Sequence, residues 1–175
     1  MSLAAGVPIA TYEAALPGVP VVRVMPNTPA AVGMAMSAYA AGAHATDEHL
    51  AIADAILGSF GDAVQVEEPM LDAVTAVSGS GPAYVFLLAE AMEQAGVGLG
   101  LDPATATRLV EQTIAGAGKL LAGSSQTAEE LRIAVTSPKG TTAAALGRFA
   151  EGGFNELVAE ALQAAAARSV ELGSG

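Results

Sequence analysis

The stretch Val19-Pro20-Val21-Val22-Arg23-Val24-Met25, closed by Pro26, decides the fold class of this chain. It is brief, rich in β-branched residues and stopped by a proline, so we expect a buried strand. Residues 34–41 are a weaker strand candidate. A helix is expected over about 46–59, and residues 63–66 predict another strand. A strand, a helix and a strand in quick succession indicate α/β architecture with part of a parallel sheet.

After Pro69 the sequence predicts helices and no strand. Residues 70–77 have a helical pattern, and the run Ser78-Gly79-Ser80-Gly81 is expected to interrupt it before Pro82 begins a long helix. That helix is apolar nearly all round, which predicts that it is buried. Further helices are expected to begin at Pro103, Thr127, Ala143 and Phe154.

The change from a mixed to a purely helical pattern predicts a domain boundary, with an α/β piece over 1–68 and an all-helical piece over 69–175. The fold class is therefore mainly α with a partial α/β piece. In the helical piece, Gly116 and Gly118 lie inside a helix, where each costs about 1 kcal/mol relative to alanine. We expect a very close helix crossing there, within one chain or between subunits.

Composition narrows the function classes. The chain has 175 residues, a formal net charge of −11 and seven scattered basic residues, so it has no basic stripe for nucleic acid. The absence of cysteine excludes disulfides, thiolate catalysis and cysteine-ligated zinc. The sequence has no apolar span of about 20 uninterrupted residues and no secretory signal, so we expect a cytoplasmic protein without membrane contact.

The run Thr136–Thr142 (TSPKGTT) lies between two apolar helical patterns. A Ser/Thr-rich turn that enters a helix leaves several backbone N–H groups without intrahelical partners, at the positive end of the helix dipole. Such a turn can bind a small anion, for example a carboxylate. The alternative is a plain helix N-cap, because serine, threonine and proline are ordinary there.

Three other groups of residues are candidates for chemistry. Asn27-Thr28-Pro29 directly follows a strand, where open α/β sheets bind ligands, although an ordinary Asx turn has the same sequence. Ser78–Gly81 is compatible with a phosphate-binding nest, but no lysine follows, so we interpret it as a tight joint between helices. The spacing of His44 and His49 does not put them on one helical face, so we predict no metal site.

Four motifs occur in order along the chain: Arg23–Pro29 (RVMPNTP), Ser78–Tyr84 (SGSGPAY), Thr136–Thr142 and Glu151–Phe154 (EGGF). In this order they resemble the pyrroline-5-carboxylate reductase family, over essentially the whole chain. The resemblance implies reduction of L-1-pyrroline-5-carboxylate to L-proline by NADPH or NADH, the last step of proline biosynthesis. It also implies a homodimer or a higher homo-oligomer, in which the helical domain interlocks with a second subunit.

The resemblance also implies the domain identities. Residues 1–68 correspond to the C-terminal part of a Rossmann-type NAD(P)-binding domain, a remnant of its parallel sheet. Residues 69–175 correspond to a helical substrate-binding and dimerisation domain similar to the C-terminal domain of 6-phosphogluconate dehydrogenase. The family's GxGxxG segment, which precedes these motifs, is absent from this sequence. We therefore expect this chain alone to be inactive.

Site residues follow from the same resemblance. The hydroxyl that matches Thr142 donates to the imine nitrogen of the substrate and so promotes hydride transfer. Lys139 stands where the family usually has a small residue, commonly glycine, which adopts positive φ more easily. The implied substrate-binding residues are Glu68, Ser137, Lys139, Gly140, Thr141 and Thr142. The implied cofactor-binding residues are Met25, Asn27, Thr28, Pro29, Ser78, Gly79 and Ser80.

Two alternatives stay open at this point. One is a non-catalytic helical homodimerisation module that lacks a cofactor half. The other is a different member of the β-hydroxyacid dehydrogenase-like group, whose enzymes use a helix-borne catalytic lysine. The second is disfavoured because Lys119 lies on a helix that we expect to be committed to packing and lacks the surrounding Gly/Asn motif.

Overall fold

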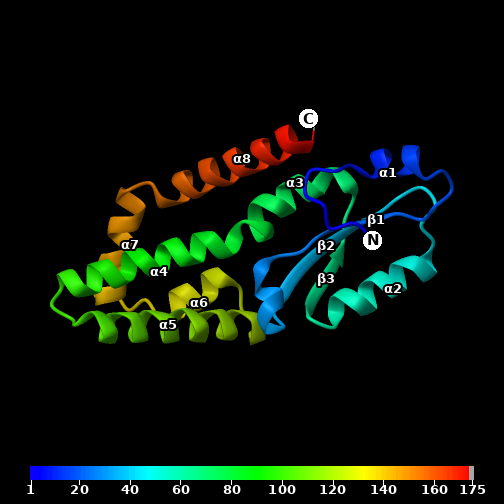
Figure 1. Ribbon diagram of the computed structural model, residues 1–175. Coiled ribbons are helices and arrows are strands. Elements are labelled where there is room, and N and C mark those ends of the chain that lie inside the picture. The colour runs from blue at the N-terminus through cyan, green and yellow to red at the C-terminus, as the bar shows by residue number, and fades with distance from the viewer. Residues whose placement is uncertain (174–175) are drawn as a thin grey trace. The chain divides into compact units, whose positions relative to one another are not determined.

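The computed structural model describes residues 1–173, which form two compact units (Figure 1). The first, here called the sheet unit, contains residues 1–83 and the chain from Ala159 onward. The second, the helical unit, contains Tyr84–Val158. The domain boundary that the sequence predicts, between residues 68 and 69, differs from this division into units and stays a prediction.

The sheet unit has three strands in the order β1-β2-β3. β2 and β3 pair in parallel, as predicted, with Ala35 opposite Gly61. β1 and β2 pair antiparallel, with Met25 opposite Ala38, a direction that the sequence does not predict. The connection from β1 to β2 is a single 3₁₀ turn, too short for the crossover that parallel strands need. The strands are β1 (Val22–Met25), β2 (Ala35–Ala41) and β3 (Gly61–Gln65).

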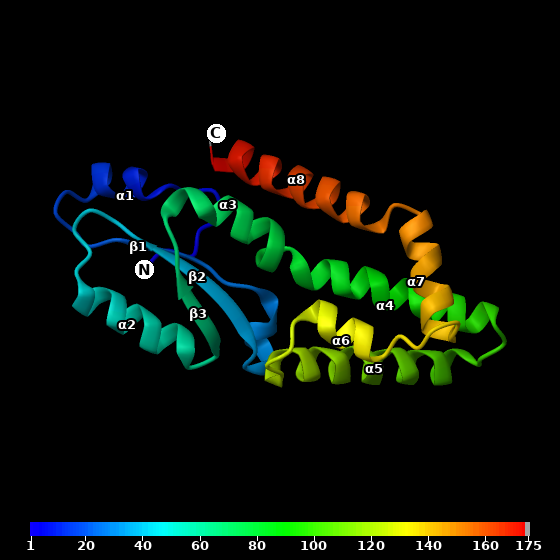
Figure 2. The same cartoon turned by 180° about the vertical axis from the view of Figure 1, so that it is seen from behind.

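Helices cover both faces of this sheet, as Figures 1 and 2 show. α2 (Asp47–Gly58) packs on one face, where Ala53 and Leu57 join a buried cluster with side chains of β1 and β2. α1 (Ile9–Ala15) and α3 (Leu71–Val74) pack on the other face around Ala38 and Ala40. The sheet is therefore buried on both sides, which explains why β2 is apolar along nearly its whole length.

The Gly/Ser run at 78–81 interrupts the regular α-helix, as predicted, although Ser80 between the two helical elements keeps α-helical φ and ψ. A 3₁₀ turn, η2 (Glu68–Met70), leads into α3, and a π-helical turn, η3 (Thr75–Gly79), leads into α4 (Gly81–Gly98). The Ser80 N–H donates to the Thr75 carbonyl at 2.8 Å, five residues back. Such single π-turns inside helices often lie at functional sites.

Glu68–Gly98 is long and apolar enough, by length and composition, to cross a membrane, with a mean hydropathy of 1.3. The mostly buried core helix of a soluble protein passes the same test, whereas only 11% of the apolar window of this span is buried within the single chain. The expectation of no membrane contact is therefore still a prediction.

The helical unit has almost no core of its own: between residues 84 and 158 only Ala106 and Val110 are buried. No residue of α4 is buried, and Phe86 and Leu87 are 67% and 65% exposed, so the predicted burial of this helix is wrong for the single chain. Its remaining helices are α5 (Pro103–Gly123), α6 (Ala128–Ala134), α7 (Thr141–Glu151) and the start of α8 (Phe154–Gly173).

Candidate functional site

Asn27 lies two residues after the end of β1, and both polar atoms of its side-chain amide are hydrogen-bonded. Its Nδ2 donates to the Ser78 carbonyl at 3.1 Å, and its Oδ1 accepts from the Met36 N–H at 2.9 Å. The side chain does not cap η1 (Thr28–Val32), the 3₁₀ turn that begins one residue later, so the Asx-turn interpretation is wrong. The Asn27 amide instead joins the strand end to β2 and to the π-helical turn.

Met25 touches the same π-helical turn. A Cβ atom built on Gly79 would lie 2.5 Å from Met25 Cε, so only glycine lets the methionine approach this closely. Four predicted cofactor residues, Met25, Asn27, Ser78 and Gly79, therefore lie together in the sheet unit. Ser80 is next to them, but its N–H is occupied by the Thr75 carbonyl and cannot bind a phosphate.

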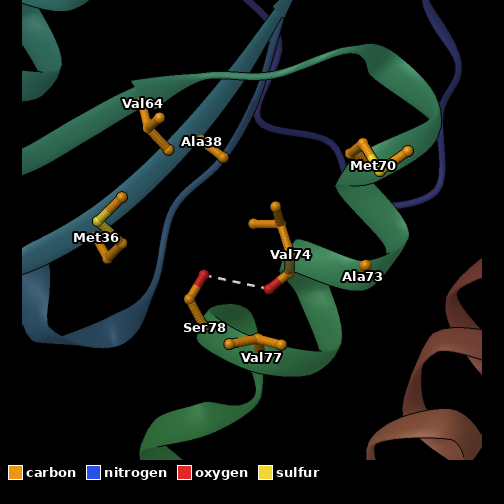
Figure 3. A pocket seen from close by; sticks show the side chains of 8 residues that line it. All are labelled: Met36, Ala38, Val64, Met70, Ala73, Val74, Val77 and Ser78. Atoms are coloured by element: carbon orange, nitrogen blue, oxygen red, sulfur yellow. Dashed lines mark hydrogen bonds between the residues drawn. The ribbon is translucent and has the colours of Figure 1, made fainter. Parts of the chain in front are cut away.

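An apolar pocket of about 410 Å³ lies next to the contacts that Met25 and Asn27 make with the π-helical turn (Figure 3). One wall comes from the sheet and the other from the helical run after Met70. Its one polar side chain, Ser78, donates its hydroxyl to the Val74 carbonyl at 3.2 Å. The sequence does not identify the pocket, although its apolar residues at 70, 73, 74 and 77 have the spacing of one helical face. The lining residues are Met36, Ala38, Val64, Met70, Ala73, Val74, Val77 and Ser78.

Glu68 is anchored rather than free in solvent. Its Oε1 accepts from the Ile9 N–H at 2.7 Å and from Arg23 Nη1 at 3.0 Å. The Arg23 side chain is 13% exposed and that of Glu68 30%, so the ion pair is partly shielded from water. The pair links the start of α1, β1 and η2 within the sheet unit, and a substrate-binding role for Glu68 stays a prediction.

In the helical unit, the loop before α7 has the backbone geometry of an uncapped helix start. Gly140 is the N-cap residue, with extended φ and ψ, and no side chain caps it, so the plain N-cap interpretation is not supported. The Gly140 N–H donates to the Ser137 carbonyl at 3.0 Å, and the Ser137 hydroxyl lies against Gly140 where a Cβ would be. Within the described residues, the hydroxyls of Thr141 and Thr142 have no hydrogen-bond partner, so they are available to a ligand.

Lys139 in this loop has a φ of +60° and is the one non-glycine residue in the left-handed region among residues 1–173. This conformation costs a residue with a Cβ about 1–2 kcal/mol. The loop therefore keeps the backbone shape that glycine would give it, at some cost in stability, and gains a positive charge beside the uncapped helix start.

Replacing Lys139 by glycine should raise the free energy of unfolding by roughly 0.5–1 kcal/mol, because the strain is removed while the entropy cost of glycine is added. Urea unfolding at fixed protomer concentration measures the change. Lys139→Ala is the matched control: it removes the same charge without relieving the strain, so it should not stabilise. Equal stability of the two variants would contradict the strain at this position.

Residues 1–173 contain no cluster of three potential metal ligands. His49, one of the two histidines considered for metal binding, instead accepts the Thr46 N–H at 3.2 Å through Nδ1 and completes the capping box of α2. This contact explains a histidine at the third position of that helix.

Comparisons with known proteins agree with this arrangement. Residues 68–172 match a family model described as pyrroline-5-carboxylate reductase dimerisation. A pyrroline-5-carboxylate reductase of Mycobacterium tuberculosis is 46% identical over 98% of this chain, which spans 64% of that relative's length. The solved structure of a pyrroline-5-carboxylate reductase from Coxiella burnetii has a TM-score of 0.94 at 38% identity, over 98% of this chain and 64% of that one. For the Plasmodium falciparum pyrroline carboxylate reductase with NADP bound, the TM-score is 0.89 at 33% identity, over 98% and 70%.

Proposed function

This chain belongs to the pyrroline-5-carboxylate reductase family, and we propose that the protein containing it reduces L-1-pyrroline-5-carboxylate to L-proline with NADPH or NADH. The reaction adds a hydride and a proton across a C=N bond, as the last step of proline biosynthesis. The observation that carries the proposal is the uncapped start of α7 at Ser137–Thr142, whose donors suit a small substrate with one carboxylate.

The substrate loop acts by position and charge. The free N–H groups of the first turn of α7 bind the substrate carboxylate, and Lys139 adds a positive charge beside them. The hydroxyl of Thr142 donates to the imine nitrogen, which makes the neighbouring ring carbon more electrophilic. The proposed substrate-binding residues are Ser137, Lys139, Gly140, Thr141 and Thr142, and the resemblance adds Glu68.

The turn after β1 suits the nicotinamide end of the cofactor. It lies at the carboxyl end of a strand, where open α/β sheets bind ligands. Thr28 is exposed in this turn, and within the described residues its hydroxyl has no partner, so a polar group is free to meet the nicotinamide amide. When bound, the reduced nicotinamide supplies the hydride. The proposed residues of the cofactor site are Met25, Asn27, Thr28, Pro29, Ser78, Gly79 and Ser80, of which Asn27 acts through the backbone that it holds.

We further propose a homodimer or higher homo-oligomer, a cytoplasmic location, and no nucleic-acid or membrane partner. The helical unit supports association, because its large apolar side chains are exposed and its own core is only two residues. The same exposed face explains why Glu68–Gly98 is apolar without any need for a membrane. The net charge of −11 argues against binding to phosphate backbones.

The test is oxidation of NADPH and of NADH by the purified protein that contains this chain, with and without pyrroline-5-carboxylate. Substrate-dependent oxidation, with proline as the product, is the expected result. A well-folded oligomer that binds neither the nucleotide nor the substrate would instead favour a non-catalytic homodimerisation module.

A further inference from the structure

We propose that Asn27 is a positioning residue, which fixes the turn after β1 by joining it to β2 and to the π-helical turn Thr75–Gly79. The inference depends on the proposed function in one respect, that this turn receives the nicotinamide. Because the Asn27 amide bonds the Ser78 carbonyl and the Met36 N–H, it acts on the cofactor through the backbone that it holds.

The Ser78 carbonyl needs a donor from outside its own helix. In an α-helix the carbonyl of residue 78 accepts from the N–H of residue 82, and Pro82 has no N–H. The backbone is helical on both sides of this point, since Ser80 has α-helical φ and ψ and α4 begins at Gly81. Asn27 Nδ2, at 3.1 Å, supplies the hydrogen bond that the helix cannot make.

The Met36 N–H also needs an acceptor. β1 pairs with β2 so that Met25 lies opposite Ala38, and the same register would bring residue 27 opposite Met36. β1 ends at Met25, before that pair forms. Asn27 Oδ1 accepts the Met36 N–H at 2.9 Å, in place of a backbone partner. One side chain thus pairs two backbone groups that the helix and the strand leave without a partner.

The contact of Met25 with Gly79 reinforces this junction. Met25 and Asn27 meet consecutive residues of the π-helical turn, Gly79 and Ser78, and the end of the Met25 side chain lies where a Cβ of residue 79 would be. A change in the π-helical turn therefore moves the end of β1. Thr28 follows directly, so the proposed nicotinamide site moves with it.

The test is a double-mutant cycle between Asn27→Ala and Pro82→Ala. Pro82→Ala restores an N–H that can bond the Ser78 carbonyl, so the helix no longer needs Asn27 for this bond. We expect Asn27→Ala alone to lower the thermal midpoint of this chain by about 2–4 °C or more. It should also lower kcat/KM for NADPH, in the protein that contains this chain, by roughly tenfold. In the Pro82→Ala background both losses should fall by about half or more.

Pro103→Ala is the matched control, because it makes the same substitution in the first turn of α5, where Asn27 bonds no carbonyl. In that background both losses should be unchanged. Rescue of the midpoint and of kcat/KM by Pro82→Ala supports the inference, because an N–H at residue 82 cannot replace a lost direct contact with the cofactor.

Losses that simply add in the Pro82→Ala background would overturn the inference. So would rescue of the midpoint without rescue of kcat/KM in an active enzyme, which would assign Asn27 a direct contact with the cofactor. If the wild-type protein has no reductase activity, the proposed function fails. In that case the thermal midpoints alone test the Asn27 junction. Rescue of the midpoint by Pro82→Ala supports it, and additive losses overturn it.

Discussion

Replacing Thr142 by alanine should lower kcat for pyrroline-5-carboxylate by roughly 30- to 1,000-fold, with a much smaller change in KM. Its hydroxyl, in the first turn of α7, is proposed to donate to the imine nitrogen of the substrate. That hydrogen bond strengthens as the imine becomes an amine, so it stabilises the transition state more than the bound substrate. One preorganised donor of this kind contributes about 2–4 kcal/mol. Steady-state kinetics at saturating NADPH measures both constants.

Two further variants separate this role from a general effect on α7. Thr142→Ser keeps the hydroxyl and should retain most of the activity. Thr113→Ala removes an exposed hydroxyl on α5 that bonds only the Leu109 carbonyl of its own helix, at 2.7 Å, and should leave kcat unchanged. If Thr142→Ala keeps kcat within about twofold of the wild-type value, Thr142 is not the donor to the imine.

The elements of the sheet unit could be predicted because their signals are local. A β-branched run before Pro26 indicated β1, and the helix expected over about 46–59 is α2 at Asp47–Gly58. The direction of β1 could not be predicted this way. A strand's alternation is the same in both directions, and the deciding fact is that one 3₁₀ turn, η1, connects it to β2.

The candidate site likewise has a part that could be predicted from the sequence and a part that could not. The loop before α7 could be found from its hydroxyls and its Gly140, because an uncapped helix start is a local property. The junction at Asn27 could not, because it joins residues 51 positions apart in the sequence. The Gly/Ser run and Pro82 predicted an interruption and a new helix start, but not that Asn27 would bond the Ser78 carbonyl there.

The helical unit should associate with a second copy of this chain. A unit in which only Ala106 and Val110 are buried cannot offset the conformational entropy that its helices lose on folding. The apolar side chains that a partner would bury are on α4, where Phe86 and Leu87 are 67% and 65% exposed. Obligate dimers bury more than about 2,000 Å², and many have no stable monomer. Light scattering at micromolar concentration should give about twice the chain mass of 17.2 kDa, or a higher multiple.

We expect that contact to be closest at Gly116. A Cβ atom built on Gly116 or Gly118 would meet nothing within 4 Å in this chain, which leaves the close crossing predicted there to a second subunit. In a free helix Gly116→Leu would stabilise by nearly 1 kcal/mol. At a close crossing it should instead weaken association by roughly tenfold or more, because overpacking costs about 1–3 kcal/mol. Gly147→Leu, in the middle of α7 and equally open in this chain, is the matched control and should leave the mass unchanged. A folded wild-type monomer, or a Gly116→Leu variant that associates as tightly as wild type, would mean that this glycine does not mark a subunit contact.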